Sequence, residues 1–276
     1  MIRRRRPGRI PRRVTLVISL LLAPLVVGTP AAHARAWGPV VHLCQVKDTR
    51  IVENSGMSRS TYARSTLFVH NDSGGGPQFF AIDRACRTRA VFDVPGAPAK
   101  DWEDMASGPD HTLWFGDIGG DRAVVSVVRV KEPRRLRDRE LGFRAFQLGY
   151  PDGAHNAEAL MVHPRSGRLF VVTKAPSGAG IYRAPATLSR TGVNAMTRIA
   201  DAPQGISGAD IARDRKHLVL RGYHTAFVYR RLGGRPVKLP LPAAHTFGEA
   251  VAFARDGSLV FGAEGVRQWL WHTRQQ

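Results

Sequence analysis

The sequence predicts an all-β protein, a five-bladed β-propeller, from three observations. Short β-rich runs are separated by turn residues about every 8–12 residues, and no stretch shows a sustained helical period. One motif recurs: an acid, three to five mostly apolar residues, a polar turn and a second β-rich run. The leading positions of the copies, spaced 48, 54, 52 and 39 residues apart, are Gly56, Asp104, Glu158, Asp210 and Glu249. Four-stranded propeller blades need about 40–50 residues each.

The strands expected after each leading strand follow the same pattern along the chain. Before the copy at Asp101 we expect strands at 65–72, 78–83 and 89–94. The copy at Asp101 adds 112–118, 123–130 and 143–150, and the copy at Asn156 adds 168–173, 180–184 and 197–200. The copy at Gly208 adds 217–221, 225–230 and 236–240, and the copy at Gly248 adds 258–263 and 266–272.

Ring closure explains the two incomplete ends of this pattern. The last copy, from Glu249, has 28 residues, enough for three strands, and the strand-like segment 40–53 has no partner of its own. If this N-terminal strand becomes the outer strand of the last blade, no sheet edge stays open at the seam. A six-bladed ring is the alternative; it requires one of the longer copies to be divided, and no sixth leading motif is present.

Residues 1–34 are expected to be a signal peptide that is removed, leaving a single propeller domain at 35–276. Residues 1–13 carry seven arginines and no acid, residues 14–28 are apolar, and small residues Ala32 and Ala34 precede the expected cleavage site. The apolar run is about 15 residues long and is broken by Pro24, short of the ~20 residues of a membrane span. We therefore expect a secreted monomer with no transmembrane segment. Arg12-Arg13 leaves Sec and twin-arginine export both open.

The charge and the cysteine content bear on possible partners and on disulfide bonding. The net charge of +19 falls to +12 once the seven N-terminal arginines are removed. The remaining arginines are spread through the turns and the one dense run, 131–140, also contains acids, so nucleic acid is an unlikely partner. The only two cysteines, Cys44 and Cys86, are expected to form a disulfide between the outer strand of the last blade and an outer turn of the first. Two separate buried thiols are the alternative.

The repeated acids predict a metal site. The first strand of each blade lines the channel, so Asp104, Glu158, Asp210 and Glu249 are expected to meet at its mouth, with Glu103 beside them. Converging carboxylates repel one another unless a cation neutralises them, and oxygen ligands without histidine or cysteine favour calcium over zinc. The alternative is structural: each acid accepts hydrogen bonds from the backbone of a neighbouring blade.

The ends of the second strands are expected to face the same mouth. They supply Asn71, Asp72, Asp117, Thr173, Lys174, Arg221 and Glu264. A cation beside Lys174 and Arg221 suits a phosphate or carboxylate ester, with Glu158 as a catalytic carboxylate and His155 as a candidate general base. Ion pairs with neighbouring acids, or a solvated turn histidine, are the plain alternatives for these residues.

Four segments carry a family resemblance: VHNDSGG (69–75), DWEDMASGPDHTLWFGDIGGD (101–121), YPDGAHNAEALMVHPRSGRLFVVTK (150–174) and FGEAVAFARDG (247–257). They resemble a largely uncharacterised group of secreted bacterial β-propeller proteins, distantly similar to phytase-like and gluconolactonase-like propellers. The resemblance spans about 50–272 and implies that inner-strand acids and an asparagine bind calcium or another divalent ion. Asp104, Glu158, Asp210 and Glu249 match that pattern; Asn156 does not match securely, and Gly56 departs from it.

Two functions follow from the sequence. One is a secreted, divalent-cation-dependent hydrolase of a small anionic phosphoester or a lactone or ester. The other is a non-catalytic propeller that binds a cell-envelope ligand or an extracellular partner. No HExxH, GxSxG, GxxxxGK[ST] or dinucleotide motif is present, so the sequence names no substrate.

Overall fold

The computed structural model describes residues 36–72, 74–243 and 247–276. The described residues between 36 and 276 form one compact unit, which is all-β and contains no helix. The expected signal peptide, residues 1–34, lies outside the described residues. A helix long and apolar enough to cross a membrane is absent from the part of the chain that the structure describes.

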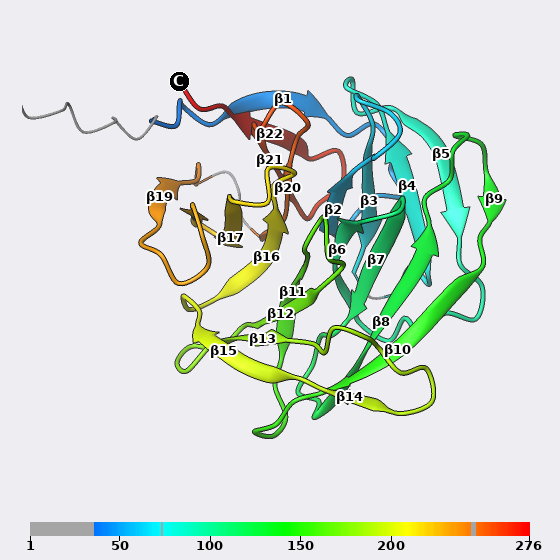
Figure 1. The fold of residues 1–276 in the computed structure, drawn as a ribbon. Helices are drawn as coiled ribbons and strands as arrows, with labels where there is room; N and C mark the ends of the chain where they lie inside the picture. Colours follow the sequence, from blue (N-terminus) through cyan, green and yellow to red (C-terminus); the bar gives the residue numbers. More distant parts are fainter. Residues whose placement is uncertain (1–35, 73, 244–246) are drawn as a thin grey trace, which may run out of the picture. The chain divides into compact units, whose positions relative to one another are not determined.

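The described residues form five sheets, which are the five predicted blades (Figure 1). Blade 1 contains β2 (Asn54–Arg59), β3 (Leu67–Asn71), β4 (Gln78–Ile82), β5 (Thr88–Asp93) and β9 (Arg139–Glu140). Blade 2 contains β6 (Trp102–Gly108), β7 (Thr112–Asp117), β8 (Val124–Lys131), β10 (Phe143–Gly149) and β14 (Val193–Ala195). Blade 3 contains β11 (Ala157–Val162), β12 (Leu169–Thr173), β13 (Gly180–Arg183) and β15 (Thr197–Asp201). Blade 4 contains β16 (Ile206–Ile211), β17 (Leu218–Gly222), β18 (Thr225–Tyr229) and β19 (Val237–Pro240), and blade 5 contains β20 (Gly248–Phe253), β21 (Leu259–Ala263), β22 (Trp269–Thr273) and β1 (Val41–Gln45).

The ring closes as predicted from the sequence. The inner strands β2, β6, β11, β16 and β20 contact one another in this order, and β20 returns to β2. The N-terminal strand β1 pairs antiparallel with the C-terminal strand β22, so the two ends of the unit share blade 5. Cys44 on β1 is bonded to Cys86 in the β4–β5 turn, which confirms the predicted disulfide across the seam of blades 5 and 1.

Blades 1 and 2 each have one strand more than the four-stranded pattern. The short strand β9 pairs parallel with β5, and β14 pairs parallel with β10. Both strands come from long connections that return to an earlier blade. These connections account for the long sequence steps of 54 and 52 residues and for the charged run 131–140, which lies mostly exposed at the outer edge.

The core lies between blades. All five inner strands are buried along their whole length. Among the described residues, five hydrophobic clusters each join two neighbouring blades around the ring. For example, Phe68 and Phe79 of blade 1 pack with Met105 and Phe115 of blade 2. Each blade therefore buries both faces, and the ring is stabilised only when it is complete.

Candidate functional site

Strand register brings two sets of side chains to one end of the channel. In every blade the first residue of the inner strand pairs with the last residue of the second strand, as in Asn54 with Asn71 and Trp102 with Asp117. A bulge follows the first pair in each inner strand. The residues within these bulges include Ser55, Glu103, Glu158, Ser207 and Glu249. The residues just after the second strands are Asp72, Ile118, Lys174, Tyr223 and Glu264. We call this end of the channel the acidic mouth.

This register corrects the alignment of copies assumed from the sequence. Glu158 and Glu249 are equivalent, as expected, but their counterpart in blade 2 is Glu103, one residue before Asp104. In blade 4 the counterpart is Ser207, three residues before Asp210. A bulge cannot be read from an acid–apolar pattern, because the pattern survives a shift of one residue while the side chains change face.

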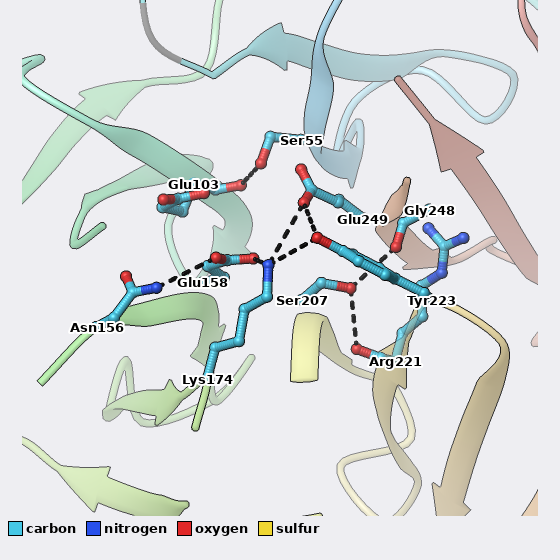
Figure 2. A network of polar contacts seen from close by, with 10 residues as sticks. All are labelled: Ser55, Glu103, Asn156, Glu158, Lys174, Ser207, Arg221, Tyr223, Gly248 and Glu249. Atoms are coloured by element: carbon cyan, nitrogen blue, oxygen red, sulfur yellow. Dashed lines mark hydrogen bonds and ion pairs between the residues drawn. The ribbon is translucent and has the colours of Figure 1, made fainter. Parts of the chain in front are cut away.

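Lys174 is at the centre of the acidic mouth (Figure 2). Its Nζ donates a short hydrogen bond to Glu158 Oε2 and another to Tyr223 Oη at 2.8 Å, and it lies 3.9 Å from Glu249 Oε1. Tyr223 Oη in turn donates to Glu249 Oε1 at 3.4 Å. Burial lowers the pKa of Lys174, but the hydrogen bonds to Glu158 and Tyr223 outweigh it and raise that pKa above its ordinary value. Lys174 is therefore a permanent cation that links blades 3, 4 and 5.

Two further acids lie on the blade 5 side of the mouth. Burial and the neighbouring Glu264 raise the pKa of Glu249, and burial likewise raises the pKa of Glu264. Because the charge of each acid affects the other, protonation of one makes ionisation of its neighbour easier. A carboxyl with a raised pKa is suited to take up or release a proton near neutral pH.

The blade 1–blade 2 side of the mouth contains a group of three acids, found among the described residues, whose spacing would suit a metal ion. Asp72, Asp101 and Glu103 each place one carboxylate oxygen within 4.8 Å of the others. Glu103 is 6% exposed, and no hydrogen bond or ion pair holds its carboxylate among the described residues. Burial, followed by repulsion from Glu158, Asp72 and Asp101, raises the pKa of Glu103 to about 10. Three hard oxygen donors whose mutual repulsion a divalent cation would relieve fit calcium or magnesium.

Gly119 leaves room for these carboxylates. A Cβ atom built on Gly119 would lie 2.0 Å from Glu103 Oε1 and 2.4 Å from Asp101 Oδ2. Asp101 itself is held by its backbone, since its N–H donates to Asp117 Oδ1 at 2.9 Å and its carbonyl accepts from Ile118 at 3.1 Å. The strand end and the following glycine turn therefore fix the acids against one another without a side chain between them.

The structure does not bring the four sequence-predicted metal ligands together. Asp104 is fully buried, and its carboxylate accepts from the N–H of Met105 at 2.8 Å, Leu160 at 2.9 Å and Ala209 at 3.1 Å. It therefore ties blades 2, 3 and 4 together below the mouth. Asp104 thus has the structural role that the sequence also allowed, in which an acid accepts hydrogen bonds from the backbone of neighbouring blades.

Asp210 has a comparable structural environment on the other side of the channel. It accepts from the N–H of Ile211 and of Phe253, both at 2.8 Å, and from Arg59 at 3.0 Å. Arg59 ends β2, so this ion pair spans from blade 1 to blade 4. Only Glu158 and Glu249 of the predicted four lie at the mouth.

Four other predicted residues are engaged within the fold. The Asn71 side chain bonds the backbone of Arg50, Val52 and Glu53. Arg221 is fully buried between blades 4 and 5, where it donates to the carbonyls of Ala250 and Gly262.

Asp117 bonds Asp101 and pairs with Arg122 at 3.3 Å. His155 bonds Asp152 at 2.9 Å and Tyr182 Oη at 3.1 Å, away from the Lys174 network.

Two mouth residues had no role in the sequence analysis. Tyr223 follows β17 at the position that Lys174 has after β12, and only the strand register reveals this equivalence. Asp101 has a clearer signal: it alternates with Glu103, so the two side chains share one face of an extended segment, and Gly119-Gly120 follows the paired strand. Reading D-x-E together with the glycine pair would have indicated this site.

The comparisons with known proteins concern the fold. The chain is similar to the soluble aldose sugar dehydrogenase of Escherichia coli, at 11% identity, covering 86% of this chain and 99% of that one with a TM-score of 0.51. It is similar to the PQQ-bound aldose sugar dehydrogenase of Streptomyces coelicolor at 11% identity, covering 86% of this chain and 98% of that one with a TM-score of 0.50. It is also similar to a glucose dehydrogenase at 12% identity, covering 87% of this chain and 100% of that one with a TM-score of 0.51. No protein-family model and no curated protein matches the sequence. The propeller fold is thus shared with enzymes, and the resemblance to the secreted bacterial group stays an expectation.

Proposed function

We propose that the protein is a secreted, divalent-cation-dependent hydrolase that acts at the acidic mouth on a phosphoester or a lactone or ester. The observation that carries the proposal is the group Asp72, Asp101 and Glu103, whose carboxylates converge in a mouth where Glu103 is buried without a partner among the described residues. The Cys44–Cys86 bond supports passage through an oxidising compartment. The similar structures support an enzyme only through their shared fold.

The proposed ligands are Asp72, Asp101 and Glu103. A divalent cation bound there would neutralise the carboxylates and polarise a phosphoryl or carbonyl oxygen. Because the donors are all oxygens, calcium or magnesium is expected rather than zinc. This set replaces Asp104 and Asp210, whose oxygens already accept backbone hydrogen bonds.

The Lys174 network would supply the remaining chemistry. Lys174 and the Tyr223 hydroxyl lie at the same mouth and would hold the anionic oxygens of a substrate by charge-assisted hydrogen bonds. Glu249, whose pKa is raised by burial and by Glu264, would accept the proton from the attacking water. Glu158 keeps Lys174 charged and oriented by its short hydrogen bond.

Calcium and magnesium titration calorimetry tests the cation. We expect one site, with an affinity that falls at least tenfold in Glu103→Gln, because the amide cannot become the anionic donor that Glu103 becomes when a cation displaces its proton. Glu140→Gln is the matched control, since Glu140 is an exposed acid on β9. Equal binding by Glu103→Gln and the wild type would remove this site from the proposal.

Turnover of a phosphoester and lactone panel tests the activity. We expect hydrolysis that a chelator abolishes and that calcium or magnesium restores, with Lys174→Met inactive and correctly folded. The alternative function, a binding propeller for a cell-envelope ligand, is favoured by the two hydrogen bonds that engage Lys174 with Glu158 and Tyr223 within the fold. Cation binding with no turnover on the panel would support that alternative.

A further inference from the structure

A cavity of about 550 Å³ opens at the seam between blades 5 and 1. Its walls include the β2–β3 and β4–β5 hairpins of blade 1, the β20–β21 hairpin of blade 5, and strands β1 and β22. The hairpins β2–β3 and β20–β21 follow the far ends of the inner strands. The cavity therefore lies at the end of the propeller opposite the acidic mouth, and we call it the seam cavity.

The wall of the seam cavity is partly apolar. Leu270 and Val260 are buried, and Leu67 and Cys44 pack against them as part of the blade 1–blade 5 core. The disulfide partner of Cys44, Cys86, belongs to the same cluster. An apolar group of a ligand could thus lie against a surface that the disulfide holds in place.

The rim of the seam cavity is basic. Four exposed arginines from four separate segments line it: Arg64, Arg84, Arg255 and Arg274. No ion pair joins Arg64, Arg84 or Arg255 to a carboxylate among the described residues. Three guanidinium groups without a carboxylate partner among the described residues therefore line one cavity.

The other charged residues of the cavity are already engaged. Arg59 pairs with Asp210 at 3.0 Å. Asp83 accepts from Arg87 and from the N–H of Ala85, both within hydrogen-bond distance.

Asp256 accepts from the backbone N–H and the hydroxyl of Ser258. Burial acts to raise its pKa, but these two hydrogen bonds and the positive charge of Arg274 lower it. The lining contains five arginines and two aspartates, so it carries a net charge of +3. Nearby, burial and then the charges of Arg255 and Arg59 lower the pKa of Arg213, as expected in a positive field.

We propose that the seam cavity binds a phosphate monoester with a short apolar chain. A guanidinium group donates two parallel hydrogen bonds to phosphate, and a dianionic head matches three arginines without carboxylate partners better than a monoanionic carboxylate does. The chain would lie against Leu43 and Leu67, the leucines of the wall that keep exposed surface. This site is separate from the acidic mouth and does not depend on the hydrolase proposal.

Titration calorimetry with hexyl phosphate below its micelle concentration tests the proposal. We expect saturable binding at one site, weakened about tenfold or more by Arg84→Glu or Arg255→Glu, because each change removes a charge-assisted contact and adds repulsion. Arg135→Glu is the matched control; Arg135 is an exposed arginine in the β8–β9 connection, and its substitution should change the affinity less than twofold. Thermal melts confirm that each variant is folded.

Two further titrations distinguish the source of the phosphate. Inorganic phosphate should bind at least tenfold more weakly than hexyl phosphate, because it lacks the chain that contacts the apolar wall. Equal binding of the two ligands, or equal effects of Arg84→Glu and Arg135→Glu, would overturn the proposal. Binding only to phosphatidic acid vesicles, with none to monomeric hexyl phosphate, would also overturn it and would identify a membrane surface as the occupant.

Discussion

Replacing Arg59 by methionine should destabilise the propeller by about 3 kcal/mol. Arg59 and Asp210 are 6% and 5% exposed in their side chains and lie 3.0 Å apart, across the channel from blade 1 to blade 4. Breaking a buried pair by removing one partner typically costs about 3–5 kcal/mol. The lower end applies because Asp210 keeps its hydrogen bonds from Ile211 and Phe253, and because methionine replaces part of the buried arginine stem.

The deficit of this variant should depend on pH. Burial raises the pKa of Asp210, and the charge of Arg59 opposes that rise. Without Arg59 the pKa of Asp210 in the folded state rises further above its value in the unfolded chain. Ionisation of Asp210 then favours the unfolded chain more strongly, so the variant loses stability as pH rises from about 4 to 8. Urea unfolding at both pH values measures this, and about 3 kcal/mol corresponds to a fall of roughly 6–12 °C in Tm for a unit of this size.

The outcome also tests the role assigned to Asp210. The double variant Arg59→Met/Asp210→Asn should lose less than the sum of the two single variants, because no charge is then left buried. Cation affinity at the acidic mouth should be unchanged in all three variants. A loss of unfolding free energy below about 1 kcal/mol in Arg59→Met, or a loss that is the same at both pH values, would refute a stabilising role for this buried ion pair.

Three other outcomes are expected. Gly119→Ala should weaken cation binding at least tenfold while the fold survives, because the new Cβ displaces the flexible Glu103 carboxylate. Gly142→Ala is the control and should bind the cation normally, since a Cβ there meets no atom within 4 Å. Equal cation affinity of the two variants in calorimetry would contradict this expectation. Reduction of the Cys44–Cys86 bond, which closes a 42-residue separation, should lower the free energy of unfolding by about 4 kcal/mol, and unchanged melting in reductant would count against a role at the seam. Tyr223→Phe should reduce turnover about tenfold, since it removes the hydroxyl between Lys174 and Glu249. The free energy of unfolding should change by less than about 1 kcal/mol. Full activity of this variant would exclude Tyr223 from the site.

The sequence determined the architecture. The spacing of the repeated motif, the short last copy and the lone N-terminal strand predicted five blades, closure by β1 and the Cys44–Cys86 bond, and the structure confirms all three. These features depend on chain length and on alternation of apolar residues, which are properties of a linear sequence. They remain readable even when the register of a strand is misjudged by a residue.

Only the tertiary structure decided which acids meet. Asp104 and Asp210 have the same chemistry as Glu103 and Glu158 and stand at similar places in the motif, yet a bulge directs the first two to buried backbone N–H groups and the others to the mouth. Asp72 and Asp101 come together with Glu103 because two blades pack side by side. The direction of a side chain reverses with each one-residue shift of strand register, and the closeness of these acids arises from the packing of blades. Neither can therefore be read from the spacing of the repeated motif.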